Sequence, residues 1–179
     1  MSLVLDQKIG LFVGSDTGNT DEIAEKFIES WKISDLELIE ASNMKVEDYD
    51  RFQIIVIGTS TWYDGDLQSD FDVFFEEFKK VDFSGKIVAL FGLGDQTGYA
   101  EYFVDGLGIL GEVVLENGGQ IIGKWSTEGY EFDDSRGLID DNHFYGLALD
   151  FENQEELNES RLQEWIQQVE SEIQGILEV

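Results

Sequence analysis

Short, almost continuous apolar runs separated by longer amphipathic stretches restrict the fold of this chain more than any other feature. Four runs are typical of buried strands, namely KIGLFVG (8–14), FQIIVIG (52–58), KIVALFG (86–92) and QIIGKW (120–125), with LELIE (36–40) as a weaker fifth. A strand that is apolar on both faces belongs in a parallel sheet, because helices cover both sides of such a sheet.

The stretches between these runs predict the covering helices. Apolar side chains recur at helical spacing over residues 20–31 and again over residues 162–177. A third stripe, which we interpret as core contacts and not as a cofactor site, consists of Phe71, Phe74, Phe75 and Phe78. Strands alternating with helices predict an α/β fold with a doubly wound, five-stranded parallel sheet and right-handed crossovers.

One segment interrupts this alternation. Residues 126–143 (STEGYEFDDSRGLIDDNH) are acidic and polar without a sustained period, and a further apolar run, FYGLALD (144–150), follows them. We therefore expect an insertion that interrupts the last strand before the chain returns to the sheet. Because proline, linker-like segments and repeats are absent, we expect residues 1–179 to form a single domain.

Charge and composition restrict the partners and the chemistry. The chain has 39 Asp and Glu against 11 Lys and Arg, a net charge of −28, which argues against nucleic acid or an anionic membrane and favours basic proteins. Without cysteine there are no disulfides, thiolate metal sites or iron–sulfur clusters, so redox work would need an organic cofactor. The start, MSLVLDQK, is too polar for a signal peptide or a spanning helix, and we expect a cytoplasmic protein.

Other polar groups give no indication of a catalytic or metal site. We interpret His143, the single histidine, as structural, since no serine or cysteine nucleophile accompanies it. The acidic pairs Asp133/Asp134 and Asp140/Asp141 lack the spacing of a calcium loop.

The loop after the first apolar run, FVGSDTGNT (12–20), is suited to an anion although it contains no lysine or arginine. Gly14 permits a tight turn and Thr20 opens the expected helix, so backbone amides and the helix dipole should face one small concavity. Ser15, Thr17 and Asn19 add neutral donors. The loop matches neither the nucleotide-triphosphate nor the dinucleotide glycine motif. The alternative is a cluster of capping residues that only starts the helix.

Two further loops each place an aromatic residue at the same edge of the expected sheet. They are TSTWYDGD (59–66), with Trp62, and GLGDQTGY (92–99), with Tyr99. Two such rings from adjacent loops could hold a flat heterocycle between them, and stacking contributes about 0.5 to 1.5 kcal/mol per pair beyond buried area. For each ring the alternative is a place on the surface without a ligand.

A phosphate loop, a tryptophan loop and a tyrosine loop in this order resemble the flavodoxins, specifically the long-chain group, over essentially the whole chain. The motifs are GSDTGNT, TWYDGDLQSDFD and GLGDQTGYAEYF. The resemblance implies non-covalently bound FMN at the switch point of a sheet with strand order 2-1-3-4-5, which is the known arrangement of flavodoxins and not a deduction from this sequence.

The resemblance also implies roles for individual residues. Trp62 and Tyr99 would flank the isoalloxazine ring, Thr61 would lie near the ribityl chain, Asp95 would accept the flavin N3–H, and the backbone from Tyr63 to Gly65 would face N5. The residues expected to bind the cofactor are Ser15, Asp16, Thr17, Gly18, Asn19, Thr20, Thr59, Ser60, Thr61, Trp62, Tyr63, Asp64, Gly65, Gly92, Leu93, Gly94, Asp95 and Tyr99. The family commonly has proline where this chain has Ser60, and Asp64 replaces a smaller or neutral residue of some relatives.

The function implied is that of a low-potential one-electron carrier, not an enzyme, that shuttles between semiquinone and hydroquinone. Its partners would be basic redox proteins such as a flavodoxin reductase and electron-accepting oxidoreductases, and the carrier would be a monomer. Two alternatives come from related folds. An FMN-dependent NAD(P)H:quinone oxidoreductase would need a substrate pocket over the ring. A phosphoacceptor receiver domain would need paired acids where this chain has VGSD and an aspartate where it has GTSTW.

Overall fold

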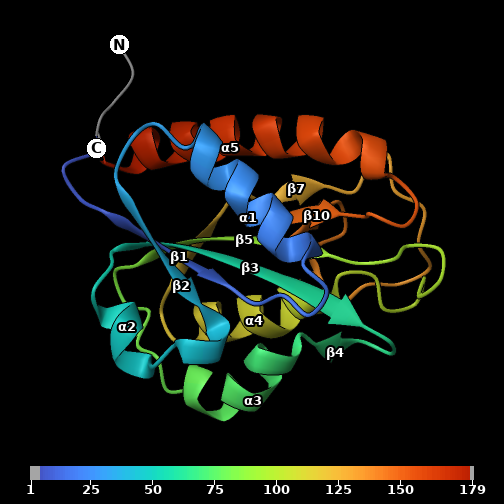
Figure 1. The fold of residues 1–179 in the computed structure, drawn as a ribbon, viewed down its shortest axis with the longest axis horizontal. Coiled ribbons are helices and arrows are strands. Elements are labelled where there is room, and N and C mark those ends of the chain that lie inside the picture. The colour runs from blue at the N-terminus through green and yellow to red at the C-terminus, as the bar shows by residue number, and fades with distance from the viewer. Residues whose placement is uncertain (1–4, 178–179) are drawn as a thin grey trace.

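The central sheet lies between two layers of helices (Figure 1), and these layers bury the apolar side chains on both faces of its strands. The computed structural model describes residues 5–177. Residues 1–4 and 178–179 lie outside the described residues. The first of these ranges opens MSLVLDQK, the segment that is predicted not to be a signal peptide. Within the described part of the chain, no helix is long and apolar enough to cross a membrane.

The sheet has the strand order expected for a doubly wound fold. Its parallel strands are β1 (Ile9–Val13), β2 (Leu36–Glu40), β3 (Ile54–Trp62), β5 (Ile87–Leu93), β6 (Gln120–Ile122) and β10 (Leu147–Leu149). They run in the order β2-β1-β3-β5, and both β6 and β10 pair with β5. The short β4 (Asp66–Leu67) pairs antiparallel with the end of β3. The predicted order is confirmed, with β6 and β10 sharing the fifth position.

An insertion divides that fifth position, as the sequence predicts. The first half of β5 pairs with β6, with Ile87 opposite Gln120, and the second half pairs with β10, with Phe91 opposite Leu147. The prediction of one strand over residues 120–125 was wrong, because β6 ends at Ile122. Gly123 follows with φ +74°, a conformation that turns the chain out of the sheet.

The segment between β6 and β10 forms a second, three-stranded antiparallel sheet that the sequence does not predict. Its strands are β7 (Trp125–Ser126), β8 (Leu138–Asp140) and β9 (His143–Phe144), in the order β7-β9-β8. The apolar run of residues 144–150, with which the chain is expected to return to the sheet, is divided between β9, which ends at Phe144, and β10, which does return to it. Strands of two or three residues are too short to show the alternation by which strands are recognised in a sequence.

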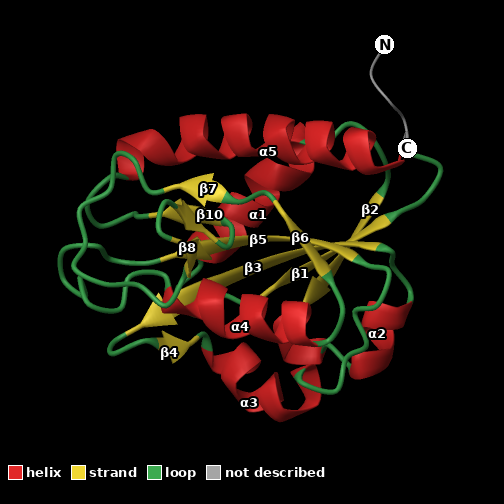
Figure 2. Ribbon diagram, turned by 180° about the vertical axis from the view of Figure 1, so that it is seen from behind, coloured by secondary structure: helices red, strands yellow, loops and turns green. Residues whose placement is uncertain are grey.

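The two helical layers bury separate cores (Figures 1 and 2). On one side lie α1 (Asn19–Ser30) and α5 (Glu155–Leu177), and on the other lie α2 (Val46–Asp50), α3 (Ser69–Phe78), α4 (Asp105–Glu116) and a short 3-10 helix (Ala41–Asn43). Along β3, Ile54 and Val56 belong to the first core while Ile55 and Ile57 belong to the second. This alternation explains why residues 54–57 are apolar at every position.

The phenylalanine stripe on α3 contributes to the core, as interpreted from the sequence. Phe71 and Phe78 are buried, and the partly buried Phe74 and Phe75 pack against the same cluster.

Helix α4 is absent from the sequence-based prediction because three glycines weaken its helical pattern. The structure gives two of these glycines a packing role. A Cβ atom at Gly108 would lie 1.8 Å from the carbonyl oxygen of Arg136, and one at Gly111 would lie 2.4 Å from the Tyr145 ring. The insertion and the chain that follows it thus pack directly on the backbone of α4, which only glycine permits.

Candidate functional site

A pocket opens at the carboxyl edge of the sheet, between the loops that follow β1, β3, β5 and β10. Its empty volume is about 600 Å³ including the open space at its mouth, which lies within the range of small-molecule sites. It is lined by Asp16, Thr17, Asn19, Thr20, Ser60, Thr61, Trp62, Tyr63, Leu93, Gly94, Asp95, Tyr99, Phe151 and Glu152. The three loops that the sequence predicts as binding segments therefore converge on one pocket.

Most of the expected residues line this pocket, and a few lie beside it. Those that do not line it are Ser15, Gly18, Thr59, Asp64, Gly65 and Gly92. Phe151 and Glu152 line it without having been expected. They follow β10 directly, so the rule that ligands bind beyond the carboxyl ends of the strands could have indicated them once the interrupted strand was placed.

The loop between β1 and α1 presents an uncapped helix end to the pocket. Helix α1 begins at Asn19, one residue before the predicted start, and Gly18 precedes it with φ 95° and ψ −9°. No side chain of the described residues caps this end, and the first amide bonded within the helix is that of Glu22, which donates to the Gly18 carbonyl at 3.0 Å. Ser15 Oγ accepts from the Gly18 amide at 3.0 Å and shapes the loop. The first-turn amides are thereby left available to an anion.

Asp16, the acidic residue of this loop, is bonded to the start of α3. Its carboxylate accepts hydrogen bonds from the Gln68 side chain at 3.0 Å and from the Ser69 amide at 3.3 Å, and the Ser69 hydroxyl donates a further one. The hydrogen-bond donors to the Asp16 carboxylate are therefore all neutral groups.

The tryptophan loop is more regular than the sequence predicts. Strand β3 continues through Thr59, Ser60 and Thr61 to Trp62, because β4 pairs back onto it with Asp66 opposite Trp62. The indole N–H of Trp62 donates to Ser60 Oγ at 2.9 Å. The hydroxyl of Ser60 therefore fixes the orientation of the Trp62 ring by a hydrogen bond.

The turn between β3 and β4 rests on a buried carboxylate. Tyr63 and Gly65 both have positive φ, 46° and 91°. A Cβ atom at Gly65 would lie 2.6 Å from Oδ2 of Asp105, whose Oδ1 accepts from the Arg136 amide at 2.7 Å. Burial raises the pKa of Asp105, and the hydrogen bond and charge of Arg136 partly oppose this. Asp105, the first residue of α4, thus packs against the turn between β3 and β4.

Three aromatic side chains meet at the mouth of the pocket. The Tyr63 ring lies 6.3 Å from Trp62 and 6.2 Å from Tyr99, centroid to centroid, and is 62% exposed. Trp62 and Tyr99 line the pocket, as expected of residues that would flank a flat ligand, and Tyr63 bridges them in edge and tilted contacts.

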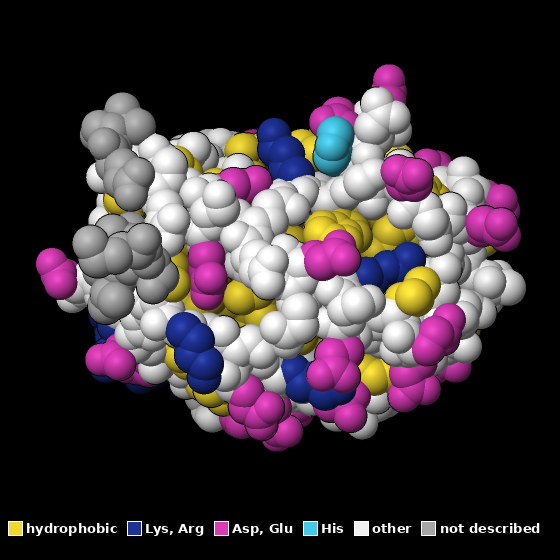
Figure 3. All heavy atoms as spheres, turned by 90° about the horizontal axis from the view of Figure 1, so that it is seen from above, with side chains coloured by type: hydrophobic (Ala, Val, Ile, Leu, Met, Phe, Trp, Pro, Cys, Tyr) yellow, Lys and Arg dark blue, Asp and Glu magenta, His cyan; other side chains and the backbone are white. Residues whose placement is uncertain are grey.

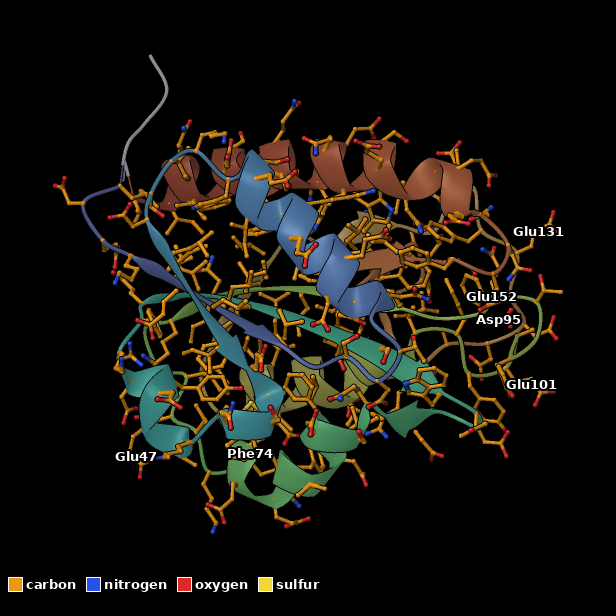
Figure 4. All side chains as sticks on the ribbon, viewed as in Figure 1. Glu47, Phe74, Asp95, Glu101, Glu131 and Glu152 are labelled. Atoms are coloured by element: carbon orange, nitrogen blue, oxygen red, sulfur yellow. The ribbon has the colours of Figure 1, made fainter. Side chains whose placement is uncertain are left out.

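Asp95 presents an ionised carboxylate at the tyrosine loop. Its Oδ1 accepts from the amides of Thr97 (3.1 Å) and Gly98 (2.7 Å) and from the Asn153 side chain (2.8 Å). Burial alone would raise the pKa of Asp95, but these hydrogen bonds together lower it below its ordinary value. Figure 4 shows Asp95, Glu101, Glu131 and Glu152 toward the same end of the molecule as the pocket.

The electrostatic character of the site is strongly negative. No lysine or arginine is among the lining residues, whereas Asp16, Asp95 and Glu152 are. Acidic side chains are also spread over the neighbouring face covered by α5 (Figure 3). His143 lies outside the pocket in β9, where its Nδ1 is 2.9 Å from the Asp140 carboxylate. The arrangement favours a ligand held by neutral donors in a negative environment.

Comparisons with known proteins agree with this geometry. The Flavodoxin family model matches residues 11–165. The chain is 44% identical to a flavodoxin from Klebsiella pneumoniae, covering 92% of this chain and 94% of that protein, and 44% identical to one from Nostoc sp., covering 94% and 98%. The crystal structure of Fusobacterium nucleatum flavodoxin bound to flavin mononucleotide superposes with a TM-score of 0.87 at 31% identity, covering 92% of this chain and 98% of that one.

Proposed function

The chain belongs to the flavodoxin family, and from this membership we propose that it binds FMN in the pocket described above and acts as an electron carrier without substrate turnover of its own. The observation that carries the proposal is the convergence of a cation-free anion loop and two aromatic loops on one pocket at the carboxyl edge of the sheet.

The residues present suit both ends of FMN. At one end, the uncapped start of α1 and the hydroxyl groups of Thr17 and Thr20 form a donor set for a phosphate monoester. At the other end, Trp62, Tyr63 and Tyr99 offer aromatic surface to a flat ring. Gly94, which lines the pocket, lies against the start of α4, where a Cβ atom would come to 3.0 Å from the Val104 backbone nitrogen, so glycine permits this close packing of the loop.

The resemblance to flavodoxins supplies the individual roles that we propose. The loop of residues 15–20 would hold the phosphate, Thr61 would contact the ribityl chain, and Trp62 and Tyr99 would flank the ring. The ionised carboxylate of Asp95 would accept the ring N3–H, and the backbone of the Tyr63–Gly65 turn would lie near N5. Pocket lining supports the direct roles of Thr61, Trp62 and Tyr99, while Ser15, Gly18 and Gly65 act by shaping their loops.

FMN supplies the redox chemistry, because when bound it takes up and releases electrons one at a time. The chain sets the potential at which this occurs. Carboxylates at the pocket and a net charge of −28 oppose the addition of negative charge inside it. Each 1.4 kcal/mol of such opposition lowers a one-electron potential by about 59 mV, so a few kcal/mol produce a low-potential carrier.

The same charge determines the class of partner. An acidic surface around the pocket attracts basic redox proteins, such as a flavodoxin reductase and electron-accepting oxidoreductases, and disfavours nucleic acid and anionic membranes. We infer that the protein works in the cytoplasm as a monomeric, single domain spanning residues 1–179.

Reductive titration of the purified protein under anaerobic conditions tests the proposal. The protein should be yellow, contain one FMN per chain, and take up two electrons in separate one-electron steps. A colourless protein that does not bind added FMN would refute cofactor binding. Reduction in a single two-electron step, together with steady oxidation of NAD(P)H in the presence of a quinone, would instead identify an FMN-dependent oxidoreductase.

A further inference from the structure

A fully buried carboxylate lies directly behind the pocket. Asp150 follows β10 and has 0% exposure. Its Oδ2 accepts from the Gln96 amide (3.1 Å), the Gln96 side chain (2.8 Å) and the Asn153 side chain (2.8 Å), and its Oδ1 accepts from the amides of Glu152 and Asn153, both at 3.0 Å. Within residues 5–177 no lysine or arginine forms an ion pair with it. Asp150 is thus a buried acceptor satisfied entirely by neutral N–H groups.

These donors come from two segments that form one wall of the pocket. Gln96 belongs to the loop that carries Asp95 and Tyr99, whereas Glu152 and Asn153 follow Phe151 on the other segment. Asp95, Tyr99, Phe151 and Glu152 line the pocket, while Gln96 and Asn153 do not. Asn153 links the segments a second time, because its side chain also donates to Asp95 Oδ1 at 2.8 Å. The two segments therefore meet at Asp150.

The donor pattern requires a carboxylate at this position. A carboxylate has two acceptor oxygens, while an amide has one acceptor and one NH₂ donor. The side-chain amides of Gln96 and Asn153 could rotate to suit an amide partner. The backbone amides of Gln96 and Glu152 face opposite oxygens of Asp150 and cannot reverse, so an asparagine would leave one of them opposed by another donor.

We propose that Asp150 is a positioning residue for the cofactor. It holds the Asp95–Tyr99 loop and the Phe151–Glu152 segment in register and places a fixed negative charge behind the ring end of the pocket. The phosphate end does not depend on it, since no donor to Asp150 comes from residues 15–20. The inference rests on the proposed binding of FMN. It implies that Asp150 contributes both to the affinity for FMN and to the one-electron potentials of the bound cofactor.

Two variants separate the roles of position and charge. Asp150→Asn keeps the side-chain shape and removes the charge, while Asn153→Ala at an exposed position removes the bridge to Asp95 and keeps the charge. Asp35→Asn is the matched control, because Asp35 is exposed at the start of β2 and loses the same charge. For each apoprotein, quenching of flavin fluorescence gives the dissociation constants of FMN and riboflavin, and a redox titration of the FMN-loaded protein gives both one-electron potentials.

We expect Asp150→Asn to weaken the binding of FMN and of riboflavin by the same factor, about tenfold. Both ligands carry the ring, and only FMN carries the phosphate. The potential for the second electron should become less negative, since a negative charge behind the ring has gone. Asn153→Ala should weaken the binding of both flavins by about threefold. It should change the potential for the second electron less than Asp150→Asn does. Asp35→Asn should change neither quantity.

The proposal is overturned if folded Asp150→Asn retains the original flavin affinities and potentials, or if it weakens FMN while leaving riboflavin unchanged. Should Asp150→Asn not fold, Asn153→Ala decides, and an unchanged riboflavin affinity counts against the proposal. Failure of the original protein to bind FMN would refute the proposed function instead, so the two failures are distinguishable.

Discussion

The side-chain amide of Gln68 donates a 3.0 Å hydrogen bond to Oδ1 of Asp16, 52 residues earlier in the sequence. This bond joins the anion loop, between β1 and α1, to the start of α3. Gln68 is fully buried, and its Oε1 caps α3 by accepting from the amides of Asp70 and Phe71, both at 3.1 Å. Gly14 leaves room for it, since a Cβ atom there would lie 2.1 Å from that Oε1. One buried side chain thus connects the β3–β4 hairpin, α3 and the anion loop.

Replacing Gln68 should therefore affect stability and cofactor binding together. Gln68→Met keeps the length of the side chain but leaves the α3 amides without their cap and Asp16 without one donor. We expect the free energy of unfolding to fall by about 1 to 3 kcal/mol and FMN to bind more weakly. Urea denaturation of the apoprotein and FMN titration measure the two effects. Unfolding at the original urea concentration would contradict the bracing role of Gln68.

Gly18 and Gly85 provide a matched pair for testing the anion loop. Both have positive φ, +95° and +75°, and a Cβ atom at either would meet nothing within 4 Å. Alanine at each should lower the free energy of unfolding by about 1 kcal/mol through backbone strain alone. Only Gly18→Ala should also weaken FMN, because Gly18 orients the amides at the start of α1. Equal losses of FMN affinity in both variants would refute this role.

Tyr99→Ala tests the aromatic wall. We expect FMN to bind about tenfold more weakly or worse, since stacking and buried ring area are lost together, and both one-electron potentials to shift. Leu115→Ala is a suitable control because Leu115 on α4 is 42% exposed, close to the 40% of Tyr99, and lies outside the pocket. Flavin fluorescence quenching measures the affinities, and an unchanged affinity for Tyr99→Ala would argue against stacking.

Tyr130 should make the stability of the protein fall at alkaline pH. Burial raises the pKa of Tyr130 to about 12 from its ordinary 10.0, although the nearby Arg161 and a hydrogen bond from Trp125 act in the opposite direction. Below pH 10 the hydroxyl is protonated in both states. Between pH 10 and 12 only the unfolded chain loses the proton, so stability falls as the pH rises, by up to about 2 to 3 kcal/mol.

Tyr130→Phe isolates this effect from the other tyrosines. At about pH 8 the variant should be less stable by about 1 to 2 kcal/mol, because the phenol accepts from Trp125 Nε1 at 2.9 Å and donates to the Ala148 carbonyl at 2.6 Å. The difference between the two proteins should narrow as the pH is raised toward about 11. Urea denaturation across this range measures the difference, and a constant gap would contradict the raised pKa.

Electron transfer to a basic acceptor, such as a cationic c-type cytochrome, should slow as salt is added. The Debye length is about 10 Å at 0.1 M ionic strength, so attraction between surface charges weakens strongly in this range. Asp66→Asn and Asp72→Asn, both exposed beside Trp62 and Tyr63, should lower the low-salt rate, whereas Asp35→Asn should not. Stopped-flow kinetics would show this. A rate independent of salt would argue against steering by the acidic surface.

The anion loop shows which features of the site follow from the sequence and which do not. Its residue types predict a cradle of neutral donors, because glycine, hydroxyl and amide groups determine local conformation and donor capacity. The sequence also places Trp62 and Tyr99 at the carboxyl edge. It does not reveal that Asp16 is held by Gln68 and Ser69, or that Tyr63 lies between the two rings, since these contacts join distant segments.

The sequence by itself determined the doubly wound sheet, the interrupted last strand and the three binding loops, because hydrophobic periodicity and turn residues act over a few neighbouring positions. Only the tertiary structure decided that glycine-rich residues 105–116 form a helix, that the insertion folds into its own small sheet, that Phe151 and Glu152 line the pocket, and that Asp150 is buried next to them in the chain. These features depend on close packing and hydrogen bonds between segments far apart in the chain, and such contacts leave no periodic pattern in the sequence.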